Sequence, residues 1–146
     1  MFPKAITLVT LGVADLERSR AFYAALGWEA ASAPEGVVFI QLRGQVLALF
    51  EIGALAADMG GVDPAGLGTG ASTLARNFAT EAEVDAAFAL ALAAGAREIK
   101  RPEKVVWGGY AGYFADPDGH VWELAMNPFW PLAADGTLTL PEGETP

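Results

Sequence analysis

The stretch FADPDGHVWEL, from Phe114 to Leu124, decides the fold of this 146-residue chain. The residues Asp-Pro-Asp-Gly at 116–119 are typical of a tight turn. Mostly apolar residues lie on either side of them, so the stretch predicts a strand, a turn and a second strand. Side chains alternate between the two faces of a strand, which predicts that His120 and Glu123 point to opposite faces. Glu123 is then a single carboxylate in an apolar strand, and it either serves a site or faces water.

The residues before this stretch predict one strand, one helix and further strands. Ser72–Ala79 (STLARNFA) is typical of a strand. Thr80 and Glu83 have the spacing of a capping box at a helix N-terminus, and Gly95 marks the end of that helix. Further strands are expected within AREIKRPEKVVW, GGYAGYFAD and HVWELAM.

The first half of the chain has the same plan. Ile6–Val13 (ITLVTLGV) predicts a strand, Asp15 is placed to cap a helix, and Gly27 is placed to end it. Two strand candidates follow, GVVFIQL from Gly36 and QVLALFEI from Gln45. Because the order of strand, helix and strands occurs twice, the predicted architecture is one domain of two βαβββ modules.

The composition is that of a globular protein, because 53% of the residues are hydrophobic and 18% are charged. Cysteine is absent from the sequence, which excludes disulfides and thiolate metal sites and agrees with a cytoplasmic location. No apolar run approaches the roughly 20 residues that span a bilayer, and no signal peptide is predicted. The net charge of −9 argues against nucleic acid and anionic membranes as partners and favours a cationic ligand. Solubility alone is the simpler role for this acidity.

Two segments resemble the vicinal oxygen chelate superfamily, which includes glyoxalase I, bleomycin-resistance proteins and extradiol dioxygenases. VADLERSRAFYAALGW (Val13–Trp28) is similar to its first-module signature, and FADPDGHVWEL (Phe114–Leu124) is similar to its second-module signature. The resemblance covers about residues 5–127. It implies an α+β fold in which two βαβββ modules form a curled eight-stranded mixed sheet around a cup-shaped cavity. It also implies a homodimer.

The expected boundaries divide this single domain into four parts. They are module one at about 5–53, a linker loop at about 54–70, module two at about 71–127 and a C-terminal tail at 128–146. The linker contains the glycine and proline residues that are typical of such segments. The tail is apolar for a chain end, so aromatic residues such as Phe129 are expected to lie across the mouth of the cup or against a partner subunit.

In metal-using members of the superfamily, the first and last strands of each module supply the ligands. Alignment on the two halves places these four positions at Leu8, Ala48, Thr73 and Glu123, and Glu51 lies close to the second of them. Leu and Ala have no donor atom and Thr supplies a weak one, whereas a divalent cation needs several oxygen or nitrogen donors. We therefore expect no metal and no cofactor.

Alternation along the strands, together with the aromatic residues near Gly108, predicts the ligand-binding residues. They are Leu8, Thr10, Thr73, Asn77, Trp107, Tyr110, Tyr113 and Glu123. Aromatic rings of this kind stack well on a flat or cationic ligand. Ordinary core packing is the simpler role for each apolar position, and a β-bulge with core aromatics is the simpler role for the aromatic ones.

A partly buried Glu123 without a metal needs a hydrogen-bond donor or a cation, because burial disfavours the ionised carboxylate. The candidates are Arg76, Asn77, the hydroxyl of Tyr110 or Tyr113, and a bound cationic ligand. A structural carboxylate bonded to backbone or water is the alternative. His120, the only histidine, is expected to make local hydrogen bonds at the turn.

The predicted function is that of a metal-independent small-molecule-binding protein similar to the bleomycin-resistance branch. Such a protein sequesters a cationic or aromatic ligand by shape, stacking and acidic charge. The alternative is a glyoxalase-like lyase or isomerase in which Glu123 is the catalytic general base or a residual metal ligand. Metal analysis of the purified protein separates the two, since stoichiometric metal favours the enzyme.

Overall fold

The computed structural model describes residues 1–143 and has an α+β fold, as the sequence predicts. Its described residues contain three α-helices and seven strands, which form one sheet of three strands and one of four. The chain divides into two compact units. Unit 1 is Met1–Gly70 together with Pro117–His120, and unit 2 is Ala71–Asp116 together with the chain from Val121 onward.

Unit 1 contains the three-stranded sheet, in the order β1-β3-β2. Its main elements are β1 (Leu8–Val13), α1 (Leu16–Ala25), β2 (Val37–Gln41) and β3 (Val46–Glu51). Strand β1 runs parallel to β3, and β2 runs antiparallel to it. The Asp15 side chain caps α1 by accepting from the Arg18 amide at 3.0 Å, and Gly27 follows the helix with φ of 94°, as predicted. Phe22 and Tyr23 are the buried aromatic residues of α1, which packs against β3.

The strand missing from unit 1 is reduced to a single bridge between Ser32 and Phe39. This bridge lies beyond β2, where a complete βαβββ module would have its remaining strand. The Ala31 and Ser32 amides both donate to the Phe39 carbonyl, and Pro34 follows without an amide hydrogen to extend the ladder. The described residues therefore carry seven strands in two sheets, where the sequence analysis expected eight strands in one curled sheet.

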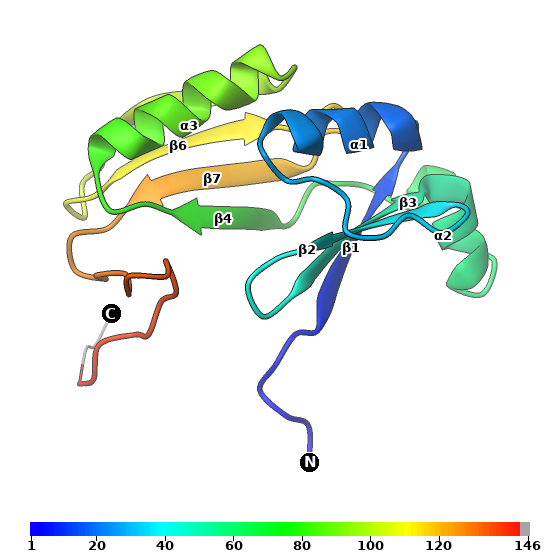
Figure 1. Cartoon of the computed structure of the whole chain (residues 1–146), viewed down its shortest axis with the longest axis horizontal. Helices are drawn as coiled ribbons and strands as arrows, with labels where there is room; N and C mark the ends of the chain where they lie inside the picture. The colour runs from blue at the N-terminus through cyan, green and yellow to red at the C-terminus, as the bar shows by residue number, and fades with distance from the viewer. Residues whose placement is uncertain (144–146) are drawn as a thin grey trace. The chain divides into compact units, whose positions relative to one another are not determined.

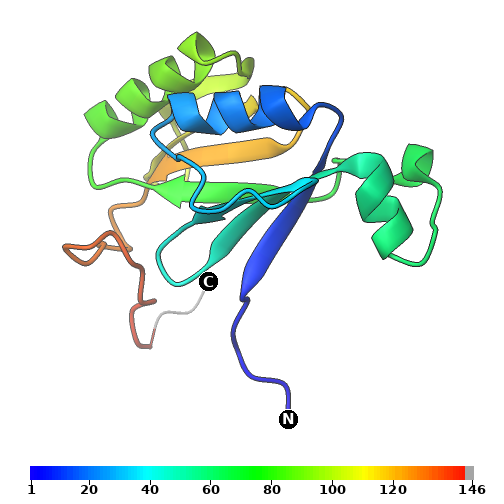
Figure 2. The ribbon, with the colours of Figure 1, turned by 45° about the vertical axis from the view of Figure 1, so that its right-hand side comes forward.

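The segment after β3, expected to be a linker loop, contains helix α2 (Ile52–Asp58) and the short 3-10 helix η1 (Pro64–Gly66). Both Glu51 carboxylate oxygens accept backbone amides, Oε1 from Gly53 at 2.9 Å and Oε2 from Ala54 at 2.8 Å. These two bonds lower the pKa of the Glu51 carboxyl. Figure 2 shows α2 beyond the end of β3, outside the three-stranded sheet. Glu51 is thus the N-cap of helix α2.

Unit 2 contains the four-stranded sheet, in the order β4-β7-β6-β5. Its elements are β4 (Thr73–Asn77), α3 (Glu81–Ala93), β5 (Arg97–Lys104), β6 (Tyr110–Ala115) and β7 (Val121–Met126). Helix α3 covers one face of the sheet and packs on β5, β6 and β7 (Figure 1). Of the predicted capping box, the first bond is present: Thr80 Oγ1 accepts from the Glu83 amide at 3.1 Å. The return bond is shifted by one residue, since Glu83 Oε2 accepts from the amide of Ala79, which precedes the N-cap, at 3.0 Å.

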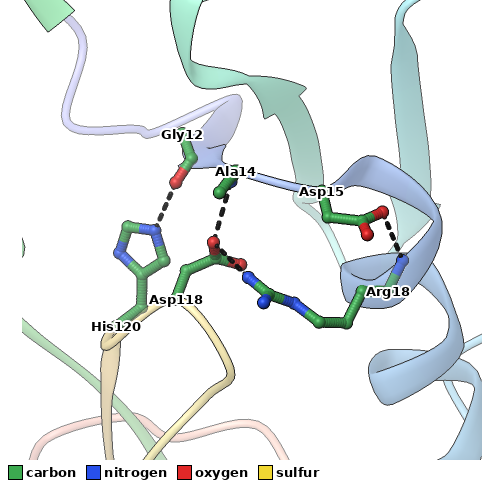
Figure 3. Close-up of polar contacts among 6 residues, drawn as sticks. All are labelled: Gly12, Ala14, Asp15, Arg18, Asp118 and His120. Atoms are coloured by element: carbon green, nitrogen blue, oxygen red, sulfur yellow. Dashed lines mark hydrogen bonds and ion pairs between the residues drawn. The ribbon is translucent and has the colours of Figure 1, made fainter.

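The turn between β6 and β7 belongs to unit 1 and is fixed there by side chains (Figure 3). Asp118 Oδ1 accepts from the Ala14 amide at 2.8 Å and forms an ion pair with Arg18 at 3.0 Å. His120 Nε2 lies 2.7 Å from the Gly12 carbonyl oxygen, which can only accept, so Nε2 donates in this contact. The hydrogen bond expected for His120 at the turn is therefore made to a strand 108 residues away in sequence.

The tail after β7 forms its own turn within unit 2. The Gly136 amide donates to the Ala133 carbonyl and the Ala133 amide to the Thr137 carbonyl, at 2.8 and 2.9 Å. Gly136 lies against Arg76 of β4, since a Cβ added at Gly136 would be 2.9 Å from the Arg76 Nη2. Within residues 1–143, no helix is both long enough and apolar enough to cross a membrane.

Candidate functional site

Glu123 and Tyr113 form a hydrogen-bonded pair on the face of the unit 2 sheet opposite α3. The residues lie directly opposite each other on the antiparallel strands β7 and β6, and the Tyr113 hydroxyl donates to Glu123 Oε2 at 2.7 Å. The neighbouring residues Trp122 and Leu124 are buried on the other face, which α3 covers. Of the donors that the sequence analysis considered for Glu123, the structure selects the Tyr113 hydroxyl.

The pair presents hydrogen-bond acceptors only. A tyrosine hydroxyl has one hydrogen, and Tyr113 donates it to Glu123. Among residues 1–143, no group donates to Glu123 Oε1. The hydrogen bond to the carboxylate and partial burial raise the pKa of the Tyr113 hydroxyl above its ordinary value of 10.0, so the hydroxyl keeps its hydrogen at neutral pH. A ligand approaching this pair therefore meets a carboxylate oxygen and a phenol oxygen, both of which need a donor.

Small residues surround the pair on this face of the sheet. Register places Ala75 of β4 directly opposite Glu123, while Ala111, Ala115 and Ala125 are two residues away along β6 and β7. Val121, on the other side of Glu123 along β7, is the one larger apolar neighbour at this distance on β6 and β7. A residue two positions along a strand shares its face, so the two polar side chains project from a floor of alanines. Thr73 and Asn77, two residues on either side of Ala75, are on the same face. The structure thus brings four predicted ligand-binding residues onto one face, namely Thr73, Asn77, Tyr113 and Glu123.

Tyr110 lies on the opposite face of the sheet from Tyr113. Its hydroxyl donates to Asp85 Oδ1 of helix α3 at 2.7 Å, and this bond raises the pKa of Tyr110. The two tyrosines are three positions apart along β6, and residues an odd number of positions apart on a strand point to opposite faces. Tyr110 therefore joins the helix to the sheet and is separate from the site, in contrast to the sequence prediction.

Trp107 lies at the tip of the β5–β6 hairpin, outside the strands. The turn closes by a hydrogen bond of 3.0 Å from the Gly108 amide to the Val105 carbonyl. The Trp107 ring lies over Gly109, where an added Cβ would come within 1.9 Å of ring atoms. The side chain is 45% exposed, so a large aromatic surface is available at this turn.

Leu8 and Thr10 belong to unit 1, on the face of its sheet that carries Ala48 and Phe39. Ala48 pairs with Thr10 on one side and with Phe39 on the other. In unit 2, Glu123 has the same position between Ala75 and Tyr113. In unit 1 the carboxylate is thus replaced by a methyl group and the phenol by a phenyl ring. The two sheets share a pairing plan, but only unit 2 has a polar pair at this position.

The residues at the four family ligand positions do not fit a divalent cation. Leu8 and Ala48 have no donor atom, and Glu123 Oε2 already accepts from Tyr113. Glu51, the nearest other carboxylate in sequence, caps α2 with both oxygens. In the part of the chain that the structure describes, no group of three or more His, Asp or Glu side chains is arranged to hold a metal.

Arg76, another candidate partner for Glu123, is engaged elsewhere. Its Nη1 donates to the Asn77 carbonyl, and its guanidinium lies 5.2 Å from the centre of the Phe78 ring. Sequence reasoning missed Lys100, which pairs directly with Tyr113. Bulges in β5 shift its register, so counting along the sequence does not show which β5 residue lies opposite the site.

The chain belongs to the Glyoxalase/Bleomycin resistance protein/Dioxygenase superfamily, whose family model matches residues 5–124. It is similar to a glyoxalase-related enzyme from Fulvimarina pelagi, with 37% identity, coverage of 94% of this chain and 99% of that chain, and a TM-score of 0.86. A glyoxalase/bleomycin resistance protein/dioxygenase from Nocardioides has 26% identity, coverage of 86% and 85%, and a TM-score of 0.70. A lactoylglutathione lyase from Agrobacterium tumefaciens has 25% identity, coverage of 88% and 97%, and a TM-score of 0.67. No curated protein gives a significant match to the chain.

Proposed function

We propose that this protein binds a small cationic or donor-rich molecule without a metal, through the acceptor pair Tyr113–Glu123. The observation that supports this most directly is the 2.7 Å bond from the Tyr113 hydroxyl to Glu123, which uses the only hydrogen of the pair. An ammonium or amide N–H supplies the donor that Glu123 Oε1 and the phenol oxygen need. The net charge of −9 attracts cations over a longer range.

The mode of binding that we propose is sequestration, similar to the bleomycin-resistance branch of the superfamily. Glu123 anchors the charged group of the ligand, the alanine floor leaves room beside it, and exposed aromatic surface at Trp107 is available for stacking. The proposal also includes a cup-shaped cavity that holds the ligand. It further includes a homodimer and a cytoplasmic location.

A matched pair of probes tests the role of Glu123. Benzylamine is a cation at neutral pH and benzyl alcohol is its neutral analogue, so a charge-dependent site prefers the amine in isothermal titration calorimetry. Glu123→Gln should weaken benzylamine binding by about tenfold, because a charge-assisted hydrogen bond is replaced by a neutral one. Asp85→Asn is the matched control, since it alters the other tyrosine–carboxylate pair on the helix side. Equal affinity of wild type and Glu123→Gln for benzylamine would contradict the proposal.

A second candidate function is that of a lyase or isomerase in which Glu123 acts as a general base. It is favoured by the same carboxylate, whose Oε1 receives no hydrogen bond among residues 1–143 and lies on a partly exposed face. Such an oxygen can take a proton from a carbon atom next to a carbonyl group. The measurement is exchange of that proton for deuterium, followed by NMR with dihydroxyacetone as the probe in D2O. Catalysed exchange that disappears in Glu123→Gln supports the enzyme, and exchange at the uncatalysed rate supports the binding protein.

A further inference from the structure

A row of three polar side chains crosses the sheet of unit 2. Lys100 of β5 pairs with Tyr113 of β6, and Tyr113 pairs with Glu123 of β7. Directly paired residues place their side chains on the same face, and strands about 4.8 Å apart put the Lys100 and Glu123 backbones roughly 10 Å from each other. We infer that this row recognises a zwitterionic small molecule, with its ammonium group at Glu123 and its carboxylate at Lys100. The inference rests on the proposed function and narrows its ligand class.

A second contact supports the position of Lys100 on the site face. Its Nζ lies 3.3 Å from Glu103 Oε1, and Glu103 pairs with Ala111. Ala111 is two residues from Tyr113 on β6 and therefore shares its face. The ion pair and the strand register thus agree on the direction of the Lys100 side chain.

Gly112 allows the bulge that sets Lys100 opposite Tyr113. The register of β5 against β6 shifts on both sides of Lys100. The β5 backbone approaches β6 so closely there that a Cβ on Gly112 would be 2.7 Å from the Pro102 nitrogen and 2.8 Å from the Lys100 carbonyl oxygen. A residue without a side chain is needed at this contact, and it keeps Lys100 in the row.

The charges on this face have opposite signs at the two ends of the row. Arg97 pairs with Ala115, so it joins Lys100 and Glu103 on the β5 end of the site face. Two cations and one carboxylate give this end a net charge of +1. Arg97 has no ion-pair partner in the described residues, and the Lys100 ammonium has three hydrogens, of which Glu103 takes one. An anionic group is favoured at this end and a cationic group at Glu123.

Edge protection is the other role that these charges serve. An edge strand with Lys, Pro and bulges resists pairing with other chains, and β5 has all three. Edge protection does not depend on which face a lysine occupies. Lys104 pairs with Tyr110, whose hydroxyl bonds α3, so Lys104 lies on the helix side of the same strand. Lys100 and Lys104 are therefore a matched pair for separating the two roles.

Three related probes measure the contribution of each charge of the ligand. They are 4-(aminomethyl)benzoate, which carries both charges, benzylamine, which carries the cation alone, and 4-methylbenzoate, which carries the anion alone. In calorimetric titrations at low ionic strength, wild type should bind the zwitterion about three to ten times more tightly than benzylamine, the size of a partly exposed ion pair. Lys100→Met should remove this preference without weakening the binding of benzylamine, because it takes away a positive charge that attracts only the carboxylate. Lys104→Met should retain the preference.

The outcomes separate this inference from the proposed function. Equal binding of the zwitterion and benzylamine to wild type, or the same loss in Lys104→Met as in Lys100→Met, overturns the inference. If the inference is overturned in this way but Glu123→Gln weakens the binding of both benzylamine and 4-(aminomethyl)benzoate, the proposed function is still supported. If Glu123→Gln binds benzylamine as wild type does, or if none of the three probes binds, the proposed function and the inference fail together.

Discussion

Tyr113 is the residue whose titration reports on the site directly. Its pKa is raised mainly by the hydrogen bond to Glu123, so the bond is intact below the ordinary tyrosine pKa of 10.0 and is lost as the pH rises through the raised value. Glu123→Gln removes the negative charge and should bring the Tyr113 titration back toward 10.0, as measured by absorbance at alkaline pH. Asp85→Asn should do the same to Tyr110 alone. A Tyr113 titration unchanged by Glu123→Gln would show that the pair does not form.

Asp118 stabilises the turn between β6 and β7. Its side chain is 6% exposed, and it accepts the Ala14 amide in addition to pairing with Arg18. Asp118→Ala leaves a backbone donor without its partner and should lower the free energy of unfolding by about 1–3 kcal/mol, measured by urea denaturation. Arg18→Met is the control, since its side chain is 48% exposed and its ion pair contributes less than about 1 kcal/mol. Equal losses in the two variants would assign the stability to the ion pair.

At the scale of elements, the bulged contact between β5 and β6 depends on Gly112. Gly112→Ala should lower the free energy of unfolding by about 1–3 kcal/mol, because its methyl group meets the backbone at Pro102 and Lys100. Gly68→Ala is the matched control: a Cβ there meets nothing within 4 Å, so its effect should stay within about 0.5 kcal/mol. Denaturation curves of the two variants provide the comparison. A Gly112→Ala variant as stable as wild type would show that the bulge relaxes freely.

Helix α2 depends on the Glu51 cap. The two amide bonds lower the pKa of Glu51, so its contribution to the helix is present above the ordinary value of 4.5 and is lost as the pH falls through the lowered one. Glu51→Ala should therefore speed hydrogen exchange at the Gly53 and Ala54 amides at neutral pH, as seen by NMR. As the pH falls below 4.5 and through the lowered pKa of Glu51, the difference from wild type should shrink. Equal exchange at neutral pH would contradict the capping role.

The elements that the sequence predicts well are those with strong local signals. Asp15, Thr80 and the Asp-Pro-Asp-Gly turn at 116–119 act through neighbouring backbone groups, and the structure places caps and a turn at each. Helix α2 was missed because Glu51 was considered as a metal ligand and not as a cap. The fourth strand of unit 1, which the family resemblance implies, is present only as a single bridge at Ser32, and the residues around it have no alternating pattern.

The site was predictable to the level of single faces of strands. Alternation predicts that Glu123 and Trp122 point to different faces of the sheet and that Thr73 and Asn77 share a face, and the structure agrees. Partners across strands were not predictable, because register depends on turns and bulges that period-two counting ignores. Tyr110 was expected at the site, but its hydroxyl bonds Asp85. Lys100 was not considered, but it pairs with Tyr113.

At the scale of the whole molecule, the homodimer stays a prediction, and exposed apolar residues in unit 2 supply its rationale. Val106, Trp107 and Phe129 are 106%, 45% and 57% exposed, and a large side chain of this kind is usually covered in solution. Light scattering should give twice the chain mass for the full chain and the single mass for Phe129→Ser and for a chain ending at Asn127. Leu90→Ser, which changes an apolar residue 47% exposed on α3, should keep the double mass. A full chain that scatters as a single copy would remove the dimer, and a shortened chain that still scatters as two would move the interface away from the tail.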